Sequence, residues 1–101
     1  MKQKTLFCGI ATALATPMTS SGAIDYDAYG RLIDWQIESG VAGLVTCGTT
    51  GETSTMTAEE HRQTIAFAVK RAAGRVPVIA GTGSNDTAYA VELSQKAEAL
   101  G

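Results

Sequence analysis

Two adjacent threonines between two glycines are the residues of this chain best suited to bind a small anion. They form the segment Gly48-Thr49-Thr50-Gly51, which follows an apolar run. Gly48 and Gly51 can adopt backbone angles closed to other residues and let a ligand approach the main chain, while the threonine hydroxyls and nearby N–H groups can donate hydrogen bonds. The spacing predicts a carboxylate-binding turn, although a plain strand-to-helix connection uses the same residue types. Glu52 would then accept backbone N–H bonds or pair with a cation.

The single histidine, His61, is expected on the surface of a helix rather than in a metal site. It follows Glu59 and Glu60, and no second histidine or cysteine is spaced to join it as a ligand. Cys8 and Cys47 form no CxxC pair, which favours reduced thiols in a cytoplasmic protein. The chain also lacks a Ser-His-Asp set, a Cys-His pair and a cluster of metal carboxylates. We therefore expect neither a metal nor a cofactor.

A nucleophile for covalent chemistry on a carbonyl is not found among these residues. Such chemistry needs an amine with a depressed pKa, usually a lysine on a buried strand. The lysines lie in the amino-terminal tail or on expected helices, at Lys2, Lys4, Lys70 and Lys96. None of the four has the sequence context of a Schiff-base lysine.

Three units of similar design must position the candidate residues. Each combines a short apolar strand, a turn rich in Gly, Ser, Thr or Asp, an amphipathic helix and a closing glycine. The expected strands are 10–16, 41–46 and 76–80, and the expected helices are 25–39, 57–73 and 87–100.

Local signals mark where the expected helices begin and end. Asp25 is a predicted N-cap, and Thr57 with Glu60 forms a predicted capping box. Gly40 suits the left-handed position after the first helix. Tyr26 and Tyr29, on the first helix, are expected to be packing residues.

Strands that alternate with helices and are apolar on both faces predict a parallel sheet with right-handed crossovers. A barrel and a doubly wound sheet both satisfy this pattern. Both place ligands at the carboxyl ends of strands, where the turns 48–52 and 81–85 fall. The second of these turns has two glycines of a dinucleotide fingerprint but Asp86 in place of the third, and no Walker lysine follows either turn, so nucleotide binding is not favoured.

The composition is that of one ordinary globular domain. The 101 residues are 45% hydrophobic and 18% charged, and the net charge of −2 provides no basic stripe for nucleic acid. No stretch approaches the roughly 20 apolar residues needed to span a bilayer. The run 6–14, which follows Lys2 and Lys4 and leads into Ala13-Leu14-Ala15, has features of a secretion signal but fits a buried first strand equally well.

Three motifs at consistent spacing resemble the dihydrodipicolinate synthase family of lysine biosynthesis. They are Gly48-Thr49-Thr50-Gly51-Glu52, Thr16-Pro17-Met18 and Gly81-Thr82-Gly83-Ser84-Asn85, and the similarity covers 10–101. The resemblance implies an α/β fold, with 1–101 forming the amino-terminal three βα units of a (β/α)8 TIM barrel. It also implies a cytoplasmic homotetrameric lyase of the lysine and diaminopimelate pathway that uses no cofactor. The reaction would condense pyruvate with aspartate semialdehyde through a pyruvyl Schiff base on lysine, giving 4-hydroxy-tetrahydrodipicolinate.

The resemblance also assigns roles to individual residues. Thr49 matches the family's proton-relay threonine, Thr50 matches the threonine that binds the pyruvate carboxylate, and Gly48 and Gly51 flank them. Residues that fit the family's lysine-effector site are Ser54, His61 and Asn85. Tyr89 stands where an effector-binding glutamate would be expected, which argues against lysine feedback.

The chain departs from the family in length, because a barrel needs eight such units and typically about 250 residues. The family's Schiff-base lysine, relay tyrosines and second-substrate arginine would follow Gly101. Residues 1–101 alone are therefore expected to be inactive, and to aggregate through unpaired sheet edges. Two alternatives stay open: a sister aldolase such as N-acetylneuraminate lyase or a keto-deoxy sugar acid aldolase, and a non-catalytic α/β module that binds an anionic metabolite.

Overall fold

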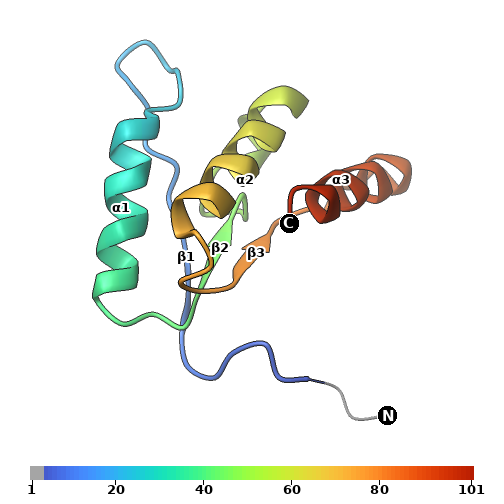
Figure 1. Cartoon of the computed structure of the whole chain (residues 1–101). Helices are drawn as coiled ribbons and strands as arrows, with labels where there is room; N and C mark the ends of the chain where they lie inside the picture. The colour runs from blue at the N-terminus through green and yellow to red at the C-terminus, as the bar shows by residue number, and fades with distance from the viewer. Residues whose placement is uncertain (1–3) are drawn as a thin grey trace.

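The computed structural model describes residues 4–101, so the expectation for Lys2 lies outside the described residues. Three strand-helix units follow one another along the chain (Figure 1). The strands and helices are β1 (Ala11–Ala13), α1 (Tyr26–Glu38), β2 (Gly43–Thr46), the short 3-10 helix η1 (Thr53–Thr55), α2 (Ala58–Ala72), β3 (Val78–Ala80) and α3 (Thr87–Ala99).

The three strands form a parallel sheet in the order β1-β2-β3, as the alternation of strands and helices predicted. Thr12, Leu44 and Val78 lie side by side across it. Each strand is shorter than the apolar run that predicted it. The backbone nevertheless continues the pairing beyond the strand ends, because Ala42 N donates to Ile10 O at 2.8 Å and Leu14 N donates to Val45 O at 2.9 Å.

The helices α1 and α2 pack on the same face of the sheet (Figure 1). Between them and the strands lies the core, which consists of Leu14, Tyr29, Ile33, Leu44, Ala68 and Ala72. On the other face of the sheet, Ile79 remains 38% exposed. A sequential strand order with its helices on one face is the arrangement of a barrel, whereas a doubly wound sheet reverses its strand order and has helices on both faces.

The predicted helix signals are confirmed. The Asp25 carboxylate accepts a hydrogen bond from Ala28 N at 3.0 Å, and Gly40 has a φ of 97° just after α1. Thr57 and Glu60 form the reciprocal capping box, with distances of 3.1 and 2.9 Å. These signals depend on residues at most a few positions apart, so local sequence was sufficient to place them.

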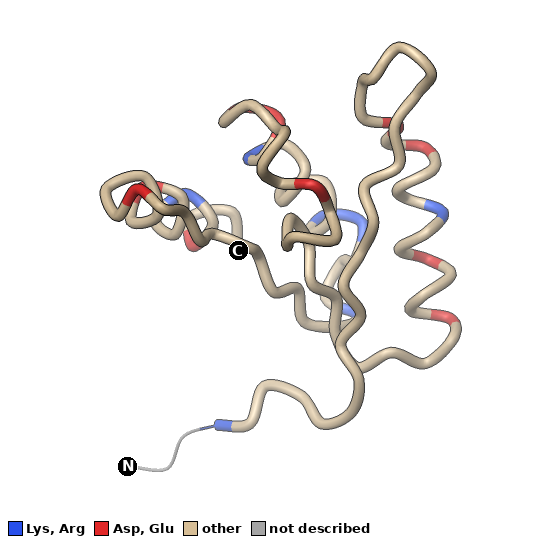
Figure 2. Tube along the Cα trace, turned by 180° about the vertical axis from the view of Figure 1, so that it is seen from behind, with Lys and Arg blue, Asp and Glu red and all other residues tan. Residues whose placement is uncertain are grey.

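Charged residues lie on the helices, the connecting segments and the amino-terminal segment, and the three strands carry none (Figure 2). One cluster of charges joins two helices: Asp34 of α1 contacts Arg71 of α2 at 2.6 Å and Arg75 at 2.9 Å. Hydrogen bonds from both guanidinium groups hold the pKa of Asp34 well below its usual value. Among residues 4–101, no helix is both long enough and apolar enough to span a membrane.

Candidate functional site

The loop after β2 presents the two predicted threonines to solvent. It closes through Gly51 N donating to Gly48 O and Glu52 N donating to Thr49 O, both at 3.0 Å. Thr49 and Thr50 are exposed, and neither hydroxyl is hydrogen-bonded to another residue of the described chain. Both hydroxyls are therefore available to a ligand.

The base of this loop is held by the short helix η1. Thr53 Oγ1 donates to the carbonyl oxygens of Cys47 and, at 2.9 Å, of Gly48. Glu52 is exposed, and within residues 4–101 its carboxylate has neither an ion-pair partner nor a hydrogen-bond donor. The loop is thus shaped by backbone and hydroxyl groups, without help from the Glu52 side chain.

The unusual backbone angles of this loop belong to residues other than the glycines. Cys47 has a φ of 57° and Glu52 a φ of 60°, whereas Gly48 and Gly51 are outside the left-handed region. The expected reason for the two glycines was therefore wrong in part. Gly51 suits a close approach, since a Cβ there would lie 3.1 Å from Thr16 Oγ1, which is a tight contact. The buried Thr16 hydroxyl donates to Gly51 O at 2.8 Å and joins the end of β1 to the loop.

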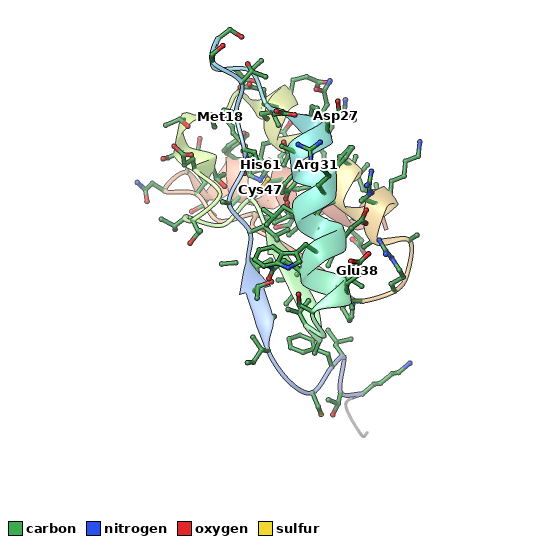
Figure 3. All side chains as sticks on the ribbon, turned by 90° about the vertical axis from the view of Figure 1, so that its left-hand side faces the viewer. Met18, Asp27, Arg31, Glu38, Cys47 and His61 are labelled. Atoms are coloured by element: carbon green, nitrogen blue, oxygen red, sulfur yellow. The ribbon has the colours of Figure 1, made fainter. Side chains whose placement is uncertain are left out.

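The surface position expected for His61 is wrong. His61 is only 2% exposed, and its Nε2 lies 2.7 Å from Gly81 O. This contact satisfies the polar ring, which can therefore be buried where α2 meets the end of β3. Figure 3 shows Cys47 and His61 next to one another in the interior behind α1, and Cys47 Sγ lies 3.9 Å from His61 O.

The turn after β3 lies directly against the end of β2. Gly81 N donates to Thr46 O at 2.8 Å, and a Cβ on Gly81 would lie 2.1 Å from Cys47 O. Only glycine fits at this position without moving the backbone. The two glycine-rich turns therefore lie side by side at the carboxyl ends of neighbouring strands, as the sequence predicted.

A cavity of about 630 Å³ opens between these two turns. It is lined by the three residues expected at an effector site, Ser54, His61 and Asn85, together with Thr49 and Tyr89. Thr50 and Gly51 are not part of its lining. Thr49 and the three residues of the expected effector site therefore line one cavity, and Thr50 lies outside it.

A buried chain of polar groups beneath the loop was missed by the sequence analysis. The Tyr29 hydroxyl lies 2.5 Å from Thr46 Oγ1, which lies 3.8 Å from Cys47 Sγ. Burial raises the pKa of Tyr29 to about 12 and the pKa of the Cys47 thiol to about 11. The expected packing role of Tyr29 is confirmed, but its hydroxyl also connects α1 to the end of β2.

The polar groups that line this region are mainly hydroxyl and backbone groups. Within residues 4–101, no group of three or more His, Cys, Asp or Glu side chains is arranged to hold a metal ion. The arrangement offers hydroxyl and backbone donors at strand ends, which suits recognition of an uncomplexed carboxylate.

Together, the sequential βα units and the donor-rich loops at the strand ends define a segment of a (β/α) barrel. A family model described as the dihydrodipicolinate synthetase family matches residues 6–101. The chain belongs to this family. A 4-hydroxy-tetrahydrodipicolinate synthase from Maridesulfovibrio salexigens is 57% identical over 95 residues, which are 94% of this chain and 32% of that protein.

Solved structures agree with this assignment. The dihydrodipicolinate synthase from Aquifex aeolicus has a TM-score of 0.89 and 50% identity, covering 92% of this chain and 31% of its own. The Acinetobacter baumannii enzyme complexed with pyruvate has a TM-score of 0.92 and 43% identity, covering 96% and 33%. The chain spans about a third of the length of these relatives. The expected fold, the first three βα units of a TIM barrel, is confirmed.

Proposed function

We propose that this chain forms the pyruvate-carboxylate part of a 4-hydroxy-tetrahydrodipicolinate synthase. The whole enzyme would condense pyruvate with aspartate semialdehyde through a Schiff base on a lysine outside residues 1–101. The observation that carries the proposal is the exposed Thr49-Thr50 pair at the end of β2, in a chain about half identical to proteins of that name. These names favour the synthase over a sister aldolase or a non-catalytic module.

Thr50 is assigned to the substrate carboxylate. Its hydroxyl is exposed and, within the described residues, unengaged, so it can donate to a carboxylate oxygen at no cost to the fold. Gly48 has no side chain to cover the loop backbone beside it, so that N–H groups can add further donors. Hydrogen bonds to a charged acceptor are the strong kind, and a few of them suffice to orient a molecule as small as pyruvate.

Thr49 is assigned to proton transfer. Its hydroxyl can both donate and accept, as a relay requires. Thr49 also lines the cavity beside the loop, whereas Thr50 does not. The tyrosines that the relay would join come from outside this chain.

The cavity lined by Ser54, His61 and Asn85 is proposed as an amino-acid effector site. Its polar lining and its position against the Thr49 loop support a regulatory ligand. Tyr89, also in the lining, provides a phenol where a carboxylate would receive an effector amine. We therefore expect lysine to inhibit the enzyme weakly, and replacement of Tyr89 by Glu to strengthen the inhibition.

The proposed reaction is tested by trapping its intermediate in the full-length protein. Incubation with pyruvate and borohydride should add the mass of a reduced pyruvyl group to one lysine. No mass gain would contradict both the synthase and the sister aldolases. Competition between aspartate semialdehyde and a keto sugar acid then separates the synthase from the aldolases. Light scattering of the same sample tests the proposed homotetramer, and cell fractionation tests a cytoplasmic location.

A further inference from the structure

A fully buried tyrosine of α1 is bonded to the residue that ends β2. Tyr29 and Thr46 are each 0% exposed, and their hydroxyl oxygens lie 2.5 Å apart. The Tyr29 ring stacks on Phe67 of α2 with a centroid distance of 5.9 Å. Packing alone would be served equally well by phenylalanine. The hydroxyl adds a polar group that must be satisfied inside the core, and Thr46 is its partner.

Thr46 connects the Tyr29 side chain directly to the loop 48–52 that follows β2. Its backbone oxygen accepts from Gly81 N at 2.8 Å, so α1 and the turn after β3 hold the same residue. The next residue, Cys47, has a left-handed φ of 57°, which is unfavourable for a non-glycine residue. Such a conformation persists only where its surroundings fix it.

The contacts around Cys47 supply that restraint. Its Sγ lies 3.8 Å from Thr46 Oγ1 and 3.9 Å from His61 O, and its carbonyl oxygen accepts the Thr53 hydroxyl. The backbone direction at Cys47 decides where the following four residues lie. A change at Thr46 would therefore displace Thr49 and Thr50 together.

We propose that Tyr29 and Thr46 are positioning residues for the loop 48–52, which is proposed to bind the substrate. Their buried hydrogen bond holds Thr46, and through it the left-handed Cys47, in the arrangement that presents Thr49 and Thr50 to pyruvate. Neither side chain touches the substrate, because both are buried on the helix side of the sheet. The inference rests on the proposed function, since it concerns the same loop.

The test compares isosteric variants of the full-length protein. Tyr29→Phe and Thr46→Val each remove one hydroxyl of the pair, and Thr46→Ser keeps it. We expect each of the first two to lower kcat/KM for pyruvate by about fivefold, the usual net effect of one hydrogen bond. The KM for aspartate semialdehyde should stay unchanged, Thr46→Ser should behave like the parent, and the double variant should be no worse than either single variant.

Two matched controls remove similar hydroxyls that do not support the loop. Tyr26→Phe changes the other tyrosine of α1, which packs on the same Phe67 at 5.0 Å but has no hydroxyl partner within residues 4–101. Thr64→Val changes a buried threonine whose hydroxyl bonds within α2, to Glu60 O at 2.7 Å. Both should leave pyruvate kinetics unchanged.

The outcomes separate this inference from the function on which it rests. Parent protein that neither turns over pyruvate nor forms the borohydride adduct would overturn both. An active parent with unchanged pyruvate kinetics in Tyr29→Phe would overturn the positioning role alone, even if the melting temperature falls. Equal losses for both substrates would likewise indicate a merely structural role. If Thr46→Val does not fold, the kinetics of Tyr29→Phe alone test the positioning role, because this variant keeps the ring that fills the core.

Discussion

His61 Nε2 lies 2.7 Å from Gly81 O, and this contact joins the first turn of α2 to the turn after β3. The two residues are 20 positions apart in sequence, and His61 is buried. The cavity beside the Thr49 loop therefore depends on a hydrogen bond between a helix side chain and a strand-end carbonyl. His61, which the sequence predicted on the surface, is therefore a buried residue that helps to hold the cavity together.

Removal of the His61 ring should destabilise the protein. His61→Leu leaves the half-buried Gly81 carbonyl without its donor, and the loss of one such hydrogen bond costs about 0.5–1.5 kcal/mol of unfolding free energy. His61→Gln should lose less, because its amide can still donate to that carbonyl. Denaturant unfolding of both variants measures the difference. Equal stability of the leucine variant and the parent would contradict this role of His61.

Thr50→Val should weaken pyruvate binding in the full-length protein. A hydroxyl donating to a carboxylate contributes about 1.5–3 kcal/mol, which corresponds to a roughly 10- to 150-fold rise in KM for pyruvate. Thr55→Val is the control, since within residues 4–101 that nearby hydroxyl donates to Glu52 O, the N-cap residue of η1, and to no other group. Steady-state kinetics with varied pyruvate provides the measurement. An unchanged KM would remove Thr50 from the carboxylate site.

Gly81→Ala should be strongly destabilising. The new methyl group would lie 2.1 Å from Cys47 O, so the backbone of one of the two turns must move. We expect a loss of about 3 kcal/mol or more, at the upper end of overpacking effects. Gly83→Ala is a matched control two residues away, because nothing lies within 4 Å of its Cβ position. Similar melting temperatures for the two variants would contradict this close approach.

Alkaline pH should weaken the fold through Tyr29. Burial is the largest cause that raises its pKa from 10.0 to about 12, so the folded state keeps the phenol proton after the unfolded state has lost it. The stability is then complete below pH 10 and is lost progressively between pH 10 and pH 12, by about 2–3 kcal/mol. Urea unfolding at several pH values should show a smaller fall for Tyr29→Phe. The same slope in both proteins would show that Tyr29 does not titrate in this way.

The two cysteines should differ in reactivity. Cys8 is exposed, whereas Cys47 is buried and its thiol pKa is raised to about 11 by that burial. Because the thiolate is the reactive form, a disulfide reagent at pH 8 should label Cys8 quickly and Cys47 only upon unfolding. In the Cys8→Ser variant, the labelling of Cys47 can be followed without the signal of Cys8. Rapid labelling of Cys47 in the folded variant would indicate that the loop opens readily.

Much of the fold could be predicted because its signals are local. Asp25, the Thr57–Glu60 capping box and Gly40 each act on backbone groups within one turn of a helix, so their residue types were sufficient. The alternation of apolar runs with amphipathic helices likewise determined a parallel sheet, and with it the edge where the glycine-rich turns meet. The Thr49-Thr50 pair was also recognisable from local sequence, because the two threonines and their flanking glycines are consecutive residues.

Tertiary structure alone decided which partners the buried polar groups find. Tyr29 meets Thr46 across 17 positions, His61 meets Gly81 across 20, and Thr16 meets Gly51 across 35. A hydroxyl or imidazole in a helical pattern looks the same in sequence whether it faces water or a carbonyl of another element. Burial must be compensated by a specific hydrogen bond, and that bond exists only once the βα units have packed. Sequence therefore determined the loop that is proposed to meet the ligand, and packing determined the contacts that hold this loop in place.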